Sequence, residues 1–75
     1  MNILYPRIRD LREDADLSQK EVAEYLRCSQ QAYSNYELGQ REVSPEILIK
    51  LAQLYHTSVD YLLGLTSQRE PYPRL

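Results

Sequence analysis

The sequence predicts an all-α fold, in which five short helices form one compact domain. A polar cap followed by apolar residues at helical spacing occurs repeatedly along the chain, as in amphipathic helices. No segment sustains an alternation of apolar and polar residues, and the Asn-Gly and Asp-Gly pairs typical of tight hairpins are absent. The 75 residues suffice for a single domain with a modest core. We expect the helical domain over residues 1–66 and an extended or disordered tail over residues 67–75.

A proline and a capping box define the first two helices. Pro6 suits the first position of a helix, because its missing N–H would have no partner there. Ser18 and Glu21 have the spacing of a capping box, which predicts the start of the second helix. Three arginines alternate with acidic residues along the first helix, and we interpret that face as a mixed, solvated one: Arg7, Arg9 and Arg12.

The second and third helices are expected to meet at a sharp corner. Ala23 supplies the small side chain that two closely crossing helices require. Arg27 and Cys28 leave room only for a tight turn, in which we interpret the cysteine as a small apolar filler. Ser29 then caps the third helix, which we expect to end near Leu38. This spacing predicts a helix-turn-helix.

Serine caps also begin the fourth and fifth helices. Ser44 precedes Pro45 at the start of the fourth, and Ser58 opens a short fifth helix that ends at Gly64. The short fifth helix and the residue after it hold more apolar side chains than so short an element can bury. We therefore predict a homodimer interface there, formed by Val59, Tyr61, Leu62 and Leu65.

A helical wheel divides the third helix into two faces. Tyr33 and Tyr36 lie on the inward arc, where we expect them to join the core. The outward arc is uncharged and rich in amides, and we predict that it reads bases: Gln30, Gln31, Ser34 and Asn35. Gln and Asn can bond N6 and N7 of adenine together in the major groove. The flanking candidates for phosphate contact are Gln19, Lys20, Gln40 and Arg41.

Composition restricts the function further. The net charge of −2 is unusual for a DNA-binding domain, although a local basic patch is enough to meet phosphate. It keeps a second hypothesis open, namely a protein-interaction module such as an antitoxin-like partner-binding protein. No nucleophile–base pair, metal-ligand spacing or Gly-rich phosphate loop is visible, so we predict no enzyme activity, no cofactor, no metal and no small-molecule ligand. Without a signal peptide or membrane span, we expect a cytoplasmic protein.

Two segments, Leu17–Ala23 and Ser29–Glu37, resemble the Cro and phage-repressor (XRE-type) helix-turn-helix family. The likeness extends from Ile8 to Gly64 and implies a five-helix, lambda-repressor-like domain. It also implies a transcriptional regulator, acting as a repressor, that binds as a homodimer to a palindromic operator in double-stranded DNA, with its third helix in the major groove.

The same resemblance assigns roles to individual residues. It implies that Gln19 and Arg41 touch phosphate, that the outward arc of the third helix faces bases, and that Arg12 pairs with Glu37. One position departs from the family pattern. Arg27 stands where family members often carry glycine, because the backbone at that point tends to be left-handed. We expect either backbone strain of order 1–2 kcal/mol there or a slightly different turn.

Overall fold

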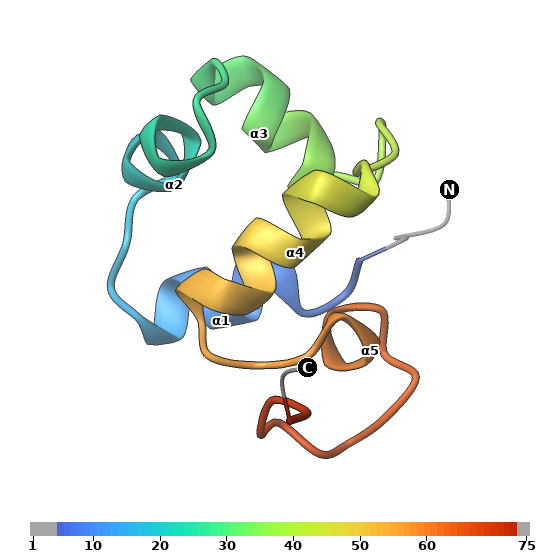
Figure 1. The fold of residues 1–75 in the computed structure, drawn as a ribbon. Coiled ribbons are helices and arrows are strands. Elements are labelled where there is room, and N and C mark those ends of the chain that lie inside the picture. The colour runs from blue at the N-terminus through green and yellow to red at the C-terminus, as the bar shows by residue number, and fades with distance from the viewer. Residues whose placement is uncertain (1–4, 74–75) are drawn as a thin grey trace.

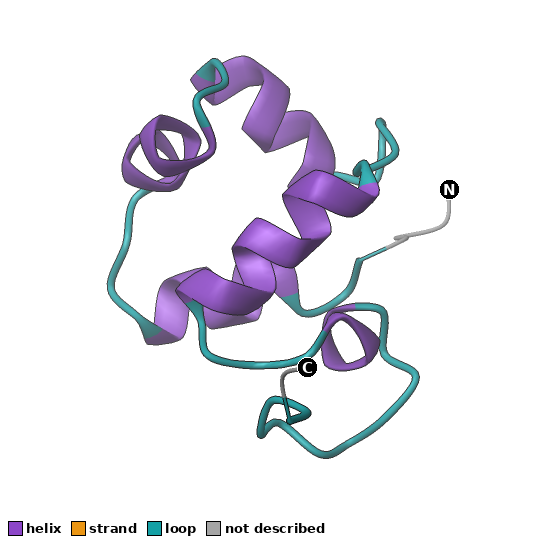
Figure 2. Cartoon of the chain, viewed as in Figure 1, coloured by secondary structure: helices purple, strands orange, loops and turns teal. Residues whose placement is uncertain are grey.

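The computed structural model describes residues 5–73 and contains five helices, with no strand among these residues (Figures 1 and 2). The prediction of an all-α fold is confirmed. In chain order the helices are α1 (Ile8–Asp14), α2 (Gln19–Leu26), α3 (Gln30–Glu37), α4 (Pro45–Leu54) and α5 (Val59–Leu62). In Figure 1, α4 runs through the middle of the molecule, with α2 and α3 above it and α5 below. None of the described helices is long and apolar enough to cross a membrane.

Four of the helices begin at the serines that the sequence marked as caps. The hydroxyls of Ser18, Ser29, Ser44 and Ser58 each accept a hydrogen bond from the backbone N–H three residues further on. At α2 the capping box is complete, because Glu21 also accepts a 2.9 Å hydrogen bond from the backbone N–H of Ser18. Such caps stabilise a helix by about 0.5–2 kcal/mol each, so the starts of these helices are fixed by local chemistry.

The start of α1 differs from the prediction. The helix begins at Ile8, whereas Pro6 and Arg7 lie in a turn. Buried Tyr5 accounts for the difference, because its hydroxyl accepts a 2.8 Å hydrogen bond from the backbone N–H of Val43. This contact ties the segment before α1 to the loop between α3 and α4, and the helix starts only after it.

Every helix is followed within two residues by a residue with left-handed backbone. Two of these residues are the only glycines of the chain, Gly39 and Gly64, which adopt this conformation at no steric cost. The other three are Asp16, Arg27 and His56, with φ between 53° and 61°. The expectation of a left-handed residue at position 27 is confirmed, with φ 61° and ψ 41°.

The core gathers the inward faces of all five helices. Tyr33 of α3 is fully buried, and its ring meets that of Tyr36 edge-on, with 6.4 Å between the centroids. Both tyrosines therefore belong to the core, as the helical wheel predicts. The other large side chains with less than 2% of their surface exposed, or close to it, are Ile8, Leu11, Val22, Leu51 and Leu62.

The interpretation of the arginines along the first helix as a solvated face is wrong for Arg7. Its guanidinium donates hydrogen bonds to the carbonyls of Tyr61 and Thr66, and it lies 4.0 Å from the centroid of the Tyr61 ring. A cation near the last carbonyls of a helix interacts favourably with the helix dipole. Arg7 thus fastens the short helix α5 to the beginning of α1.

The described part of the tail, residues 67–73, is not helical but is held against the domain. The Thr57 hydroxyl donates to the carbonyl of Arg69, and the Tyr72 hydroxyl donates to Asp60 at 3.0 Å. These contacts place the tail beside the α4–α5 corner. The expectations for residues 1–4 and 74–75 lie outside the described residues.

Candidate nucleic-acid interface

The corner between α2 and α3 is built from three features. Ala23 is 2% exposed, which lets the two helices approach closely, and its carbonyl accepts a 3.0 Å hydrogen bond from the backbone N–H of Cys28. Left-handed Arg27 reverses the chain between them. Cys28 packs against the core, where burial raises the pKa of its thiol. The short connection therefore holds α3 at a fixed angle to α2.

The outward arc of α3 is available to a partner. Gln30 and Gln31 are exposed, and Ser34 and Asn35 are half-buried. The Gln31 amide nitrogen donates a 3.2 Å hydrogen bond to the Asn35 side-chain oxygen. Because the opposite face carries the two buried tyrosines, α3 cannot turn these amides inward without exposing its core residues.

The candidate phosphate contacts lie in two groups. Lys20 at the start of α2 is exposed, as are Gln40 and Arg41 in the loop after α3. The guanidinium of Arg41 lies 5.9 Å from the centroid of the Tyr36 ring, which places the cation beside the end of α3. Both groups lie toward the C-terminal end of α3, because Gln19, which precedes Lys20, is hydrogen-bonded to Glu37 at that end.

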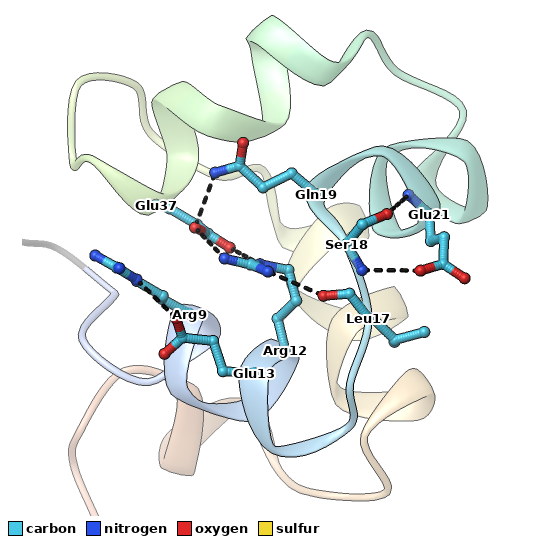
Figure 3. A network of polar contacts seen from close by, with 8 residues as sticks. All are labelled: Arg9, Arg12, Glu13, Leu17, Ser18, Gln19, Glu21 and Glu37. Carbon is cyan, nitrogen blue, oxygen red and sulfur yellow. Dashed lines mark hydrogen bonds and ion pairs between the residues drawn. The ribbon is translucent and has the colours of Figure 1, made fainter.

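Gln19 is less free than the sequence suggests. Its amide nitrogen donates a 3.1 Å hydrogen bond to Glu37, and its amide oxygen points away from that carboxylate (Figure 3). One N–H of the amide and the backbone N–H at the start of α2 are left to meet a phosphate. Glu37 therefore fixes the orientation of a predicted contact residue.

The structure brings Arg12 and Glu37 together in a two-point ion pair (Figure 3). The Arg12 Nε lies 2.6 Å from one carboxylate oxygen, and Nη2 lies 3.2 Å from the other. Nη1 donates to the carbonyl of Leu17 at 2.9 Å. Only 14% of the Arg12 side chain and 4% of the Glu37 side chain are exposed. The pair joins α1, the start of α2 and the end of α3.

Burial and pairing oppose each other at Glu37. Burial alone would raise the pKa of its carboxyl, but hydrogen bonds from Arg12 and Gln19 and the adjacent Tyr33 hydroxyl outweigh it, so the pKa is lowered. The Arg12 pKa is raised, chiefly by its hydrogen bond to Glu37. Burial also raises the pKa of Tyr33, whose hydroxyl has no hydrogen bond of good geometry in the structure. Arg12 and Glu37 are therefore both ionised at neutral pH.

The predicted dimer surface on α5 needs one correction. Leu62 is fully buried, so it belongs to the core and its assignment to the interface was wrong. A helix of four residues is too short for sequence spacing to show which of its side chains point inward. Val59 and Tyr61 are half-buried, and Leu65 is 73% exposed. These three residues stay candidates for the interface. Arg7 binds the backbone carbonyl of Tyr61 and that of Thr66, the residue after Leu65.

Comparisons with known proteins agree with this geometry. The sequence model of a helix-turn-helix family, HTH_3, matches residues 8–62. Among curated proteins, the HTH-type transcriptional regulator ImmR of Bacillus subtilis (strain 168) is 43% identical over 58 residues, which cover 77% of this chain and 46% of ImmR. The cryptic phage CTXphi transcriptional repressor RstR of Vibrio cholerae is 37% identical over 58 residues, covering 77% and 52%. The chain spans about half the length of these relatives.

Two solved structures share the fold. A transcriptional regulator from Listeria innocua superimposes with a TM-score of 0.76 at 27% identity, over 83% of this chain and 58% of that one. The clp gene regulator ClgR from C. glutamicum gives a TM-score of 0.71 at 30% identity, over 88% and 92%. The corner between α2 and α3 lies inside residues 8–62, the part of the chain that the HTH_3 model matches.

Proposed function

The chain belongs to the helix-turn-helix family HTH_3, and from this membership we propose that it is a DNA-binding transcriptional regulator. We further propose that it acts as a repressor and binds as a homodimer to a palindromic operator. The relatives named as transcriptional regulators, one of them a phage repressor, support this role for the part of their length that the chain matches.

One observation carries the proposal, namely the exposed amide face of α3. Its side chains are uncharged, so they do not repel phosphate, and each amide can both donate and accept a hydrogen bond. Base edges in the major groove present donors and acceptors in the same way. The buried tyrosines behind this face and the tight turn before it hold α3 rigidly, which is what sequence discrimination requires.

Generic duplex DNA provides the first test. Affinity should fall steeply as salt rises, because each phosphate that a cation neutralises releases counterions. The competing hypothesis, a protein-interaction module on the same fold, is favoured by the net charge of −2 and predicts no such dependence. Binding of a duplex without a salt slope, or no binding at low salt, would support that hypothesis instead.

Arg41→Ala is expected to weaken binding to all duplexes alike. If Arg41 meets one phosphate, its loss should reduce the log–log salt slope by about one unit. Titrations of wild type and variant at several salt concentrations measure this slope. Arg9→Ala is the matched control for the loss of an exposed arginine, since Arg9 is exposed and pairs with Glu13 on α1. Weaker binding with an unchanged slope would mean that Arg41 supports the loop rather than touching phosphate.

Gln31→Ala is expected to affect one base position of the half-site. The loss should be about 1–3 kcal/mol on the preferred sequence, with a preference for A·T relaxed at that position, because a bidentate amide–adenine contact has this magnitude. Binding to the selected duplex and to a scrambled one measures the difference. An equal loss on both duplexes would assign Gln31 to the DNA backbone.

The dimer follows from the limited reach of one reading helix. A single α3 spans a few base pairs, too few to select a site among ~10⁶ or more competitors. Two copies related by a two-fold axis would read half-sites ~34 Å apart. We propose Val59, Tyr61 and Leu65 as the apolar part of this interface.

A further inference from the structure

We propose that Asn35 acts on Gln31 rather than on DNA, as a positioning residue that orients the Gln31 amide for adenine. The inference rests on the proposed function, since it concerns how the same helix discriminates a base. It changes the expected role of Asn35, which the sequence alone groups with the base-reading residues.

The hydrogen bond between the two side chains has a mobile partner and a fixed one. Gln31 is exposed and has three rotatable bonds, whereas Asn35 is half-buried and has two. The backbone of Asn35 is also held, because its carbonyl accepts a 3.0 Å hydrogen bond from the N–H of Gln40 beyond the end of α3. The 3.2 Å hydrogen bond from Gln31 to Asn35 therefore restricts the glutamine more than the asparagine.

The polarity of this hydrogen bond selects one orientation of the Gln31 amide. In the structure the Asn35 oxygen accepts this hydrogen bond and the Gln31 nitrogen donates it. One N–H of that nitrogen is used, while the second N–H and the amide oxygen stay free. Adenine presents an acceptor at N7 and a donor at N6, in a fixed order along the groove edge. An amide held in one orientation matches that order before binding, and loses less entropy on contact.

A direct role for Asn35 makes different predictions. If Asn35 read its own base, its loss would relax a second position of the half-site, and losses from Gln31 and Asn35 would add. If it positions Gln31, its loss relaxes the same position that Gln31 reads. The Asn35 loss should then vanish once Gln31 is already absent. The base position at which the preference is lost therefore separates the two roles. A change in the stability of the protein alone would not alter the preference at any single base position.

The experiment uses a duplex selected by the wild-type protein from a random library, together with its single-base variants. Four proteins are compared with wild type: Gln31→Ala, Asn35→Ala, the double variant and Gln53→Ala. Gln53 is an exposed glutamine of α4 and controls for loss of an amide elsewhere. Circular dichroism of each variant verifies that the helices are intact.

Gln31→Ala should lose roughly 5- to 150-fold in discrimination at one A·T position. Asn35→Ala should lose roughly 2- to 12-fold at the same position, which corresponds to the cost of ordering one long side chain. The double variant should match Gln31→Ala. Relaxation at another position, additive losses or no loss for Asn35→Ala would each overturn the inference. If the wild type selects no sequence at all, the proposed function itself fails.

Discussion

Arg12→Met is expected to destabilise the domain by about 3–5 kcal/mol, because it leaves the Glu37 carboxylate buried without its counterion. That carboxylate is 4% exposed and would keep only Gln19 and Tyr33 nearby. A core of this size supplies about 3–5 kcal/mol of net stability, so a large fraction of the variant should be unfolded at room temperature. Urea denaturation followed by circular dichroism measures the free energy of unfolding.

Two further variants test the physical cause of this loss. Glu37→Gln should cost less than Arg12→Met, because the unpaired Arg12 is more exposed and can reach water. Replacing both by apolar residues, as in Arg12→Met with Glu37→Leu, should recover part of the stability, since no charge is then left buried. The exposed pair Arg9–Glu13 is the matched control, and its loss should cost about 0–1 kcal/mol. Equal effects at the two pairs would refute a burial effect.

The contribution of Glu37 should also depend on pH in a defined direction. Its pKa is lowered in the folded state, so the unfolded chain takes up a proton first as the pH falls. The stabilisation is therefore complete well above the ordinary value of 4.5 and is lost as the pH falls through the lowered one. The stability difference between wild type and Glu37→Gln should shrink across this acidic range.

Leu62→Ala is expected to cost about 2–5 kcal/mol, the usual loss for a leucine in a close-packed core. Leu62 is fully buried in the single chain, so the loss should be the same at every protein concentration. Leu65→Ala is the matched variant, because Leu65 is 73% exposed and close by in the sequence. For a monomer it should change stability by no more than about 0.5 kcal/mol.

Leu65→Ala therefore tests the proposed dimer without disturbing the core. Light scattering at micromolar concentration, with and without duplex DNA, should give two chains for wild type and a shift toward one chain for Leu65→Ala. A wild-type mass of one chain in both conditions would contradict the dimer and favour the protein-interaction hypothesis. A stability loss for Leu62→Ala that disappears at low protein concentration, where the wild type is monomeric, would return Leu62 to the interface.

Hydrogen bonds between a side chain and a distant backbone group were not predictable from the sequence. The Tyr5 hydroxyl meets a backbone N–H 38 residues away, and Arg7 meets a carbonyl 54 residues away. Every residue has a carbonyl and nearly every residue an N–H, so neither partner leaves a mark in the sequence. The hydrogen bond from Gln19 to Glu37 joins two side chains, and its residues were singled out separately without being predicted to meet.

The sequence by itself determined the local structure of this protein. Serine caps, apolar spacing and the small residue Ala23 act within a few neighbouring residues, so they specify where four helices begin and which face of α3 is polar. Only the tertiary structure decided where α1 begins and how α5 packs against the rest of the domain. In the folded chain α1 begins only at Ile8, Leu62 lies in the core, and Arg7 binds α5. The reason is that burial depends on every element packed around a side chain, and four residues of helix cannot define a face without their neighbours.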